Sequence, residues 1–409
     1  MKIDRHYGTL LHRYLEYFPC VTIMGARQCG KTTLLGSLGS DWRRYDLEKP
    51  EDYSAIANDP YDFLRTHPSH IAIDEAQLLP TLFPALRVVI DQAREQRGRF
   101  VLTGSSSPQL SRAVHESLAG RVGMIPMSPL MLTEAFQRPP SGFYSAVLSR
   151  QPLEAWLGRL EAQIGPEALE KYWFQGGFPE PWVRQDAGFR RAWLQAYVQN
   201  YIERDLQRLF PGLDTARFRR FLEMLAALSG SVLNYSDVAR DLAVSAPTVK
   251  DYVGIAEGLF LWRSISTYAT RLRKRLVKHP KGYLRDTGLL HYWLRVPESD
   301  ALRVHPQRGA SWEGLAAEML IQGFAAQGEN VQASFYRTRS GVEVDLILEG
   351  SFGTLPIQVK AASSVDSKAL LPLRDFIEAH RCPYGLVIHN GDRPERLSEH
   401  VAAIPLACL

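Results

Sequence analysis

Short apolar runs alternate with helical stretches through the first third of the chain. The runs are VTIM (21–24), HIAID (70–74), RFVLTG (99–104) and VGMIPM (122–127). Strands that alternate with helices are typical of a parallel sheet with helices on its faces, so the pattern predicts a three-layer α/β core. The Pro- and Gly-containing stretch QRPPSGFYS (137–145) predicts the end of this core.

A helical region is expected next, over residues 151–225, where apolar residues recur at helical spacing, for example in FRRAWLQAYVQNYIERDL (189–206). Its Trp and Tyr residues could be stacking platforms for bases. Their periodicity instead favours burial in a helical lid and linker.

A helix-turn-helix pattern follows in NYSDVARDLAVSAPTVKDYVGIAEGLFLW (234–262). Ser236 is expected to cap a first helix, and Pro247 to open a second helix after the turn AVSA. In such units the second helix lies in the major groove of DNA, which makes Thr248 and Lys250 candidate contacts. The alternative is a winged helix used only for packing or protein contacts.

A basic run, RLRKRLVKHPKGYLR (271–285), stands where the wing of such a unit is expected and contains no acid. Phosphate contacts dominate the affinity of proteins for DNA, so this run strengthens the prediction of a DNA partner. A solvated charged face is the alternative. The expected phosphate contacts are Arg273, Lys274, Arg275 and Lys278.

The last hundred residues predict a helix, ASWEGLAAEMLIQGFAAQ (310–327), and then a hairpin, VEVDLILEGSFGTLPIQVK (342–360). Glu313 shares a helix face with apolar residues and is expected to point toward the core, whereas Glu318 is expected to be exposed. The candidate site resembles that of PD-(D/E)xK nucleases and consists of Glu313, Asp345, Gln358 and Lys360. Gln358 stands where those nucleases carry a carboxylate, and this weakens the expected Mg²⁺ site. A nuclease-like fold is predicted, with cleavage in doubt.

Composition adds limits to this picture. The 409 residues exceed one typical core, and 45% hydrophobic with 22% charged residues is ordinary for a soluble globular protein. A net charge of +4 is too small to demonstrate a polyanionic partner. The four cysteines form no C-x-x-C pair, and no apolar run reaches the length of a membrane span. We therefore expect a cytoplasmic protein without a disulfide framework.

The strongest chemical signal is CVTIMGARQCGKTT (20–33), which contains the full G-x-x-x-x-G-K-[ST] pattern between a strand and a helical stretch. Its glycines let backbone N–H groups surround phosphate oxygens. Lys31 is expected to reach the β- and γ-phosphates of ATP, and Thr32 to bind Mg²⁺. A chance Gly-rich turn would give this pattern in roughly one chain in a hundred of this length. The expected nucleotide-binding residues are Gly25, Ala26, Arg27, Gln28, Cys29, Gly30, Lys31, Thr32 and Thr33.

Polar residues at the ends of two further strands complete the predicted nucleotide site. Asp74 is expected to hold the Mg²⁺ shell and Glu75 to polarise the attacking water. Thr103 or Ser105 could sense the γ-phosphate. The alternatives are solvated acids that cap a strand and an ordinary turn at a strand end.

These residues resemble a family. FPCVTIMGARQCGKTTLL, IAIDEAQ, RFVLTGSS and ESLAGRV, with GGFPEP, YIERDL and VEVDLIL further on, are similar to bacterial and archaeal AAA-type ATPases that carry a C-terminal domain of uncharacterised function. The resemblance implies an ATPase, a winged helix and a nuclease-like domain in that order. It also implies that Arg121 reaches the γ-phosphate of a neighbouring subunit, which requires a homo-oligomer. The alternative for Arg121 is a helix cap or a pair with a local acid such as Glu116.

The sequence thus predicts four regions: a P-loop ATPase core (1–140), a helical lid or linker (141–228), a winged helix-turn-helix (229–300) and a nuclease-like α/β domain (301–409). The predicted function is an ATP-hydrolysing, Mg²⁺-dependent machine that binds DNA, with a degenerate nuclease domain. An ATP-gated nuclease and an ATP-dependent signalling or transcription switch are the alternatives.

Overall fold

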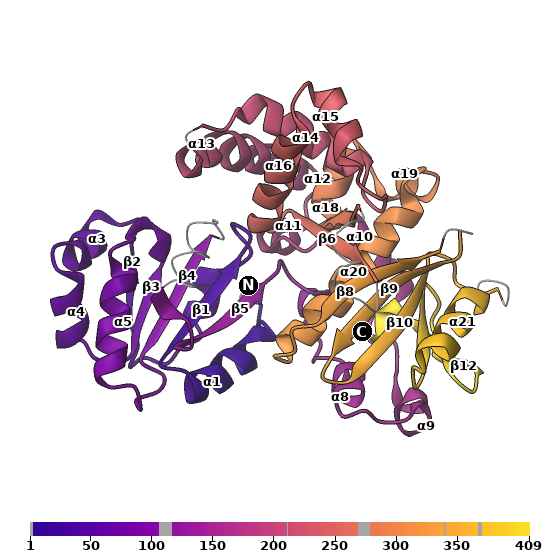
Figure 1. Cartoon of the computed structure of the whole chain (residues 1–409), viewed down its shortest axis with the longest axis horizontal. Helices are drawn as coiled ribbons and strands as arrows, with labels where there is room; N and C mark the ends of the chain where they lie inside the picture. The colour runs from indigo at the N-terminus through magenta and orange to yellow at the C-terminus, as the bar shows by residue number, and fades with distance from the viewer. Residues whose placement is uncertain (1–2, 106–116, 211, 269–278, 339–340, 367–369) are drawn as a thin grey trace. The chain divides into compact units, whose positions relative to one another are not determined.

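A computed structural model of the chain describes residues 3–105, 117–210, 212–268, 279–338, 341–366 and 370–409 (Figure 1). The chain forms two compact units. The first consists of Met1–Pro129 with Gly258–Phe260, and the second of Leu130–Glu257 with Leu261–Leu409. Within the described ranges, no helix has both the length and the apolar character needed to cross a membrane.

The first unit is built on a five-stranded sheet in the order β2-β3-β4-β1-β5, in which every pairing is parallel. This confirms the predicted parallel α/β core. Strands in such sheets are covered on both faces, which explains why β1 and β3 are buried along their whole length. The strands are β1 (Cys20–Gly25), β2 (Arg43–Asp46), β3 (Ile71–Asp74), β4 (Phe100–Ser105) and β5 (Val122–Met127).

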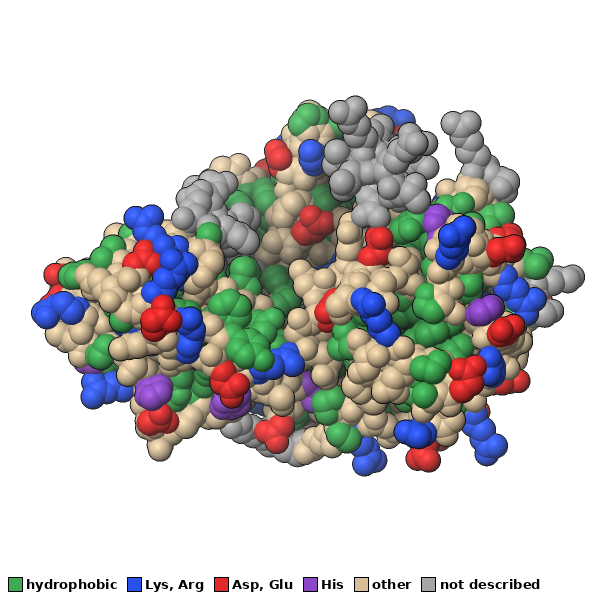
Figure 2. All heavy atoms as spheres, turned by 60° about the horizontal axis from the view of Figure 1, so that its bottom comes forward, with side chains coloured by type: hydrophobic (Ala, Val, Ile, Leu, Met, Phe, Trp, Pro, Cys, Tyr) green, Lys and Arg blue, Asp and Glu red, His purple; other side chains and the backbone are tan. Residues whose placement is uncertain are grey.

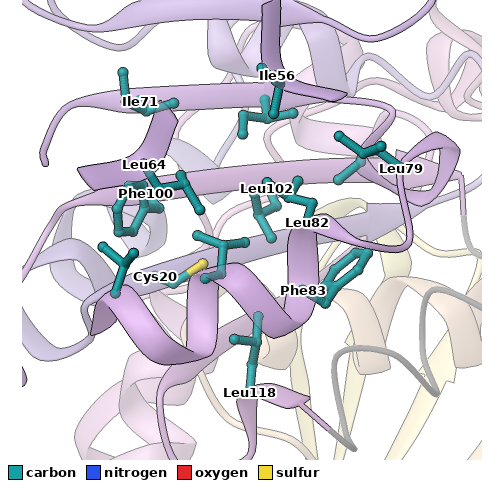
Figure 3. Packing of buried hydrophobic residues seen from close by; sticks show 14 of the residues in the cluster. Cys20, Ile56, Leu64, Ile71, Leu79, Leu82, Phe83, Phe100, Leu102 and Leu118 are labelled. Carbon is teal, nitrogen blue, oxygen red and sulfur yellow. The ribbon is translucent and has the colours of Figure 1, made fainter. Parts of the chain in front are cut away.

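Apolar helix faces close the core of the first unit. In α5 the buried residues Leu82, Phe83 and Leu86 recur at helical spacing, and they belong to one cluster with Phe100 and Leu102 of β4 (Figure 3). The helices of this unit are α1 (Tyr7–Tyr17), α2 (Lys31–Leu35), α3 (Pro50–Ala57), α4 (Pro60–Thr66), the short η1 (Ala76–Leu78) and α5 (Leu82–Gln92).

The second unit contains an eight-stranded mixed sheet in the order β12-β13-β11-β10-β9-β8-β6-β7. The antiparallel pair β6–β7 joins it because β6 pairs in parallel with β8. The sheet is therefore continuous across residue 300, where the sequence predicts a domain limit. The strands are β6 (Trp262–Thr267), β7 (Lys281–Leu284), β8 (Gln332–Arg337), β9 (Glu343–Gly350), β10 (Gly353–Lys360), β11 (Gly385–His389), β12 (Glu395–Ser398) and β13 (Val401–Pro405).

Helices make up the predicted helical region of the second unit. Its aromatic residues Trp156, Trp173, Trp182 and Trp193 are buried, so the prediction that they form a core is confirmed. The helices of the unit are α7 (Leu132–Ala135), α8 (Gly142–Leu148), α9 (Leu153–Trp156), η2 (Leu157–Arg159), α10 (Pro166–Gln175), α11 (Pro179–Arg184), α12 (Ala187–Tyr197), η3 (Val198–Asp205), α13 (Leu206–Leu209), α14 (Thr215–Ala227), α15 (Tyr235–Leu242), α16 (Ala246–Gly258), α18 (Thr287–Trp293), α19 (Ser299–Arg303), α20 (Arg308–Ala326), α21 (Leu371–His380) and η5 (Leu406–Cys408).

The helix pair α15–α16 lies where the sequence predicts a helix-turn-helix, but its first cap is different. The side chain of Asn234, not that of Ser236, caps α15, because the Asn234 side-chain oxygen accepts the backbone N–H of Ser236 at 3.0 Å. The turn passes through Ala243 in the left-handed conformation, at φ 53°. The Ser245 hydroxyl then accepts the N–H of Thr248 at 3.2 Å at the start of α16.

Glu318 on α20 is buried, so the expectation that it is exposed is wrong. Its carboxylate accepts hydrogen bonds from Arg263 on β6 and from Arg285, just after β7. Burial alone would raise the pKa of Glu318, but the two arginine charges outweigh burial and lower the pKa to about 2. Breaking a buried ion pair costs about 3–5 kcal/mol, so this cluster fastens α20 to the β6–β7 pair.

Candidate functional site

The P-loop connects the end of β1 to α2 and depends on its glycines. Gly30 has φ 100°, a conformation that strains any other residue. A side chain at Gly25 would place its Cβ 2.1 Å from the carbonyl oxygen of Met127, at the end of β5. The two glycines of the motif are therefore required by the backbone conformation and packing of the loop, independently of any ligand.

Lys31 begins α2 with a buried ammonium group. It is 5% exposed, and its Nζ donates to the carbonyl oxygens of Gly25 at 3.2 Å and Ala26 at 3.0 Å. Both acceptors are neutral, so burial of this cation is not matched by a negative charge in these hydrogen bonds. A phosphate group at the loop would supply that charge, which fits the residues to ATP.

Asp74 ends β3 and is held by two hydrogen bonds. Its Oδ1 accepts from the hydroxyl of Thr103 and from the backbone N–H of Glu75, the latter at 3.1 Å. Because β4 lies between β3 and β1, Asp74 is two strands from the P-loop, or about 10 Å at ordinary strand spacing. Mg²⁺ is usually bound by one or two protein oxygens together with substrate phosphates and water. Thr32 and Asp74 could therefore both contribute to one Mg²⁺ shell, with phosphate and water ligands filling the distance between them.

Glu75 follows Asp74 in the left-handed conformation, at φ 53°. The side-chain amide of Gln77 donates to its carboxylate, which fixes the direction of this side chain. A neighbouring acid that no sequence motif indicated, Glu48, lies close to Glu75. Partial burial raises the pKa of Glu48, and the charge of Glu75 adds to that rise. The carboxylates therefore gather at the carboxyl edge of the sheet, where parallel strands bring them together.

Thr103 and Ser105, the candidate sensors, are both on β4. Thr103 is fully buried and donates to Asp74, so its hydroxyl positions that carboxylate. Ser105 pairs in register with Gly25, and its side chain lies outside the described residues. A sensor role for either residue stays a prediction.

Arg121 lies at the opposite edge of the sheet from the P-loop of its own chain. The next residue, Val122, pairs in register with Cys20, the first residue of β1, whereas Gly25 is the last. A strand of six residues separates these edges by roughly 20 Å. Arg121 Nε and Nη2 donate to the two carboxylate oxygens of Asp91 on α5, both at 2.7 Å. Glu116, the local acid considered above, lies outside the described residues.

The predicted nuclease-like residues gather at one place in the second unit. Gln358 donates its amide N–H to Asp345 Oδ2 at 2.6 Å, and the backbone N–H of Val359 donates to the same oxygen at 2.8 Å. Burial raises the pKa of Asp345, and the charge of Glu313 adds to that rise while the charge of Lys360 opposes it. All four predicted residues are thus close enough to interact.

The sequence analysis missed a cation in this cluster, Lys281. Its Nζ donates to Glu313 and to Glu343, the latter at 3.0 Å, and the hydroxyl of Tyr283 also donates to Glu313. Burial would lower the pKa of Lys281, but the carboxylates outweigh burial and raise it. In the part of the chain that the structure describes, no three His, Cys, Asp or Glu side chains are grouped to hold a metal ion.

Lys281 and Arg285 also correct the interpretation of the basic run. Lys281 forms a largely buried ion pair with Glu313, and Arg285 forms one with Glu318. Neither side chain is therefore an exposed group that can contact a DNA phosphate. The four predicted phosphate contacts of the run all lie outside the described residues: Arg273, Lys274, Arg275 and Lys278.

The two predicted DNA contacts on α16 are both described. The hydroxyls of Thr248 and Ser245 are hydrogen-bonded at 2.8 Å, and Lys250 is exposed. No described contact therefore prevents Lys250 from reaching a ligand in solution.

Comparisons with known protein families agree with the P-loop ATPase fold described for the first unit. Residues 17–136 match a family described as an AAA domain, and residues 166–300 and 308–409 match domains of unknown function, DUF8612 and DUF4143. Over 399 residues the chain is 31% identical to the uncharacterized proteins Rv2008c of Mycobacterium tuberculosis and Mb2031c of Mycobacterium bovis, with 97% of this chain and 82% of each relative covered. This chain belongs to their family of AAA-domain proteins. Its first unit is an AAA-type P-loop ATPase domain.

Two solved structures have partial similarity to this AAA-domain protein. The Walker-type ATPase paby2304 of Pyrococcus abyssi is 13% identical, at a TM-score of 0.45 with 72% of this chain and 96% of that chain covered. The ORC1 protein of Aeropyrum pernix, solved in complex with DNA, is 14% identical, at a TM-score of 0.29 with 73% and 94% covered. Similarity at these TM-scores does not support an inference about function.

Proposed function

We propose that this protein is an ATP-hydrolysing switch or motor that acts on DNA, and that its second unit contacts the nucleic acid through the helix-turn-helix region without cutting it. The observation that carries the proposal is the helix pair α15–α16 with an exposed Lys250, followed in the sequence by the basic run of residues 271–278. On the face shown in Figure 2, the described Lys and Arg side chains are interspersed with Asp and Glu. The proposal assigns the phosphate contacts to the basic run of residues 271–278, which contains no acid.

Each residue of the nucleotide site has a role in hydrolysis under this proposal. Lys31 leaves the loop carbonyls and contacts the β- and γ-phosphates. Thr32 and Asp74 hold Mg²⁺, which supplies neutralisation of phosphate charge when it is bound. Glu75, directed by Gln77, accepts a proton from the attacking water. None of these residues of the nucleotide site requires DNA for its role. Under the proposal, DNA therefore acts by changing the rate of ATP hydrolysis.

A DNA-cutting role is disfavoured by the charges in the carboxylate cluster. Two-metal and one-metal nuclease sites need carboxylates whose charge is available to a divalent cation. Here the single ammonium group of Lys281 forms ion pairs with both Glu313 and Glu343, and the amide of Gln358 donates to Asp345. A cation would have to displace a buried ammonium group before it could bind.

The experiment that tests the proposal is the ATPase rate with and without duplex, single-stranded and branched DNA. Stimulation of turnover by any of these supports an enzyme that acts on DNA. Slow turnover that no DNA changes would contradict it and favour a signalling or transcription switch.

Charge reversal of the basic run is expected to weaken DNA binding for all sequences. A variant carrying Arg273→Glu, Lys274→Glu and Arg275→Glu should lose roughly one phosphate contact per residue, and the slope of log K against log salt should fall by roughly 3. Fluorescence anisotropy at several salt concentrations measures both quantities.

The control for that variant is Arg94→Glu with Arg97→Glu, since both arginines are exposed on the first unit, outside the basic run. The control should leave affinity and slope within twofold of the original. If the basic-run variant also keeps its affinity and slope, the run is only a solvated face.

Metal-dependent nicking is expected to require two changes at the carboxylate cluster. The original chain and Gln358→Glu alone should not nick supercoiled DNA with Mg²⁺ or Mn²⁺, because Lys281 still neutralises Glu313. Lys281→Met together with Gln358→Glu should permit binding of a divalent cation, because it removes the ammonium and restores a ligand charge. Gel electrophoresis of nicked plasmid measures the outcome, and Mn²⁺ titration by calorimetry measures binding even where nicking is absent.

These assays are best done without nucleotide and with Thr32→Ala and Asp74→Ala in the background, because these two residues are proposed to hold Mg²⁺ in the first unit. Adding Asp345→Ala should abolish any binding that the double variant gains. Nicking by the original chain that Asp345→Ala removes would show that the cluster is a working nuclease site.

A further inference from the structure

Arg5 lies just before α1 and connects the P-loop to the chain that follows β5. Its guanidinium group, which is 9% exposed, donates to three backbone carbonyl oxygens: Cys29 at 2.6 Å, Ser128 at 2.7 Å and Pro129 at 3.1 Å. Arginine can make these bonds together because its donors are held in one rigid plane. All of these residues belong to the first unit, so the arrangement does not depend on the second.

We propose that Arg5 is a positioning residue for the nucleotide, acting through the peptide bond between Cys29 and Gly30. In a trans peptide the C=O and N–H groups point in opposite directions. No peptide bond of the described chain is cis, so the Cys29 carbonyl that points to Arg5 directs the Gly30 N–H away from it. That N–H is one of the groups expected to surround the phosphates.

This peptide needs to be held because the residue after it is glycine. Gly30 has φ 100° and no side chain, so rotation of the peptide that precedes it meets little steric resistance. The loop itself offers limited restraint: the N–H of Cys29 donates to Ala26 at 3.3 Å, and its thiol lies 3.7 Å from the carbonyl oxygen of Met127. A charged hydrogen bond of 2.6 Å to the Cys29 carbonyl is therefore the strongest contact that selects one orientation.

The proposal predicts a specific split in the kinetics. Arg5 touches the loop and not the reacting atoms, and the Gly30 N–H would contact phosphate equally before and during hydrolysis. Loss of the Arg5 guanidinium group should therefore raise KM and the Kd of ATP and ADP while leaving kcat nearly unchanged. A residue that only stabilises the fold would change the melting temperature without this split.

The test compares Arg5→Gln with the original full-length chain. Titration with a fluorescent ATP analogue and with ADP should give Kd values about tenfold higher, as expected for loss of a hydrogen bond made by a charged group, and kcat should stay within twofold. Arg5→Lys keeps the charge but not the planar donors, so its Kd should lie between the two. Arg5→Lys also keeps the test open if Arg5→Gln does not fold.

Arg99→Gln is the matched control. Arg99 is also buried in the first unit and donates to the backbone carbonyls of Pro68 at 2.7 Å and Val89 at 3.0 Å. It precedes β4 at the amino edge of the sheet, away from the P-loop, so its loss should lower the melting temperature and leave the nucleotide Kd unchanged. Unchanged Kd values in both Arg5 variants, or an equal loss of affinity in Arg99→Gln, would overturn the proposal. Neither result bears on DNA binding, so the proposed function is tested separately.

Discussion

Glu75→Gln is expected to reduce ATP hydrolysis at least 100-fold while ATP binding stays intact, because general-base catalysis contributes about 10²–10⁴-fold and the amide cannot accept the proton. Lys31→Ala is expected to abolish binding itself, because it removes the charge that the phosphates need. Nucleotide titration together with a phosphate-release assay separates the two effects. The pair of variants would assign one residue to chemistry and the other to affinity.

Glu48→Gln is the control for Glu75. Both carboxylates lie at the same edge of the sheet, where burial raises the pKa of Glu48 and the charge of Glu75 adds to that rise. If Glu75 alone activates water, Glu48→Gln should keep turnover within a few-fold of the original. Turnover in Glu75→Gln that matches the original chain would rule out its assigned role.

Arg121→Ala is expected to bind ATP normally and to hydrolyse it roughly 10³-fold more slowly, the usual effect of removing an arginine that stabilises the transferring phosphoryl group. Arg121 is at the amino edge of the sheet, roughly 20 Å from the P-loop edge of its own chain, so such a role requires a second subunit. Specific activity should then rise with protein concentration. Mixing Arg121→Ala with Lys31→Ala subunits should restore some turnover, because each supplies what the other lacks.

Asp91→Asn provides the control for Arg121. The bidentate ion pair with Asp91 holds the Arg121 side chain against α5. Asp91 must release the guanidinium group before that group can reach a phosphate. If Arg121 acts at the γ-phosphate of a neighbouring subunit, Asp91→Asn should retain or increase ATPase activity while Arg121→Ala loses it. If the pair is only structural, both variants should have the same small effect. Full activity in a dilute monomer would exclude the role of Arg121 in a neighbour's site.

Local patterns identified four of the five strands of the first unit, but not the edge strand β2 (Arg43–Asp46). The strand, glycine loop and Lys31 of the P-loop are contiguous in sequence, and the runs that became β3 and β4 are bounded by polar residues where the strands end. In a parallel sheet all carboxyl ends meet at one edge, so identifying the strands also predicts that Asp74 and Thr103 gather near the loop. This arrangement follows from chain direction alone.

Two errors of the sequence analysis arose where a charge has a distant partner. Periodicity on α20 indicated an exposed Glu318, but Arg263 and Arg285 bury it from the β6–β7 pair. Lys281 was counted with the basic run that was predicted to contact DNA phosphates, yet its ammonium group is buried against Glu313, 32 residues away. A charged residue is interpreted as exposed unless its partner is known, and no local pattern identifies such a partner.

The sequence by itself determined the parallel α/β core, four of its five strands (β1, β3, β4 and β5) and the glycine-rich loop between β1 and α2, because each is set by a contiguous motif. Only the tertiary structure decided which groups contact the buried cations. It brought Arg5 to the carbonyl of Cys29 and Lys281 to the carboxylates of the C-terminal cluster. Both contacts join segments far apart in the chain, and their free energy arises from burial and distance, which exist only after the chain has folded.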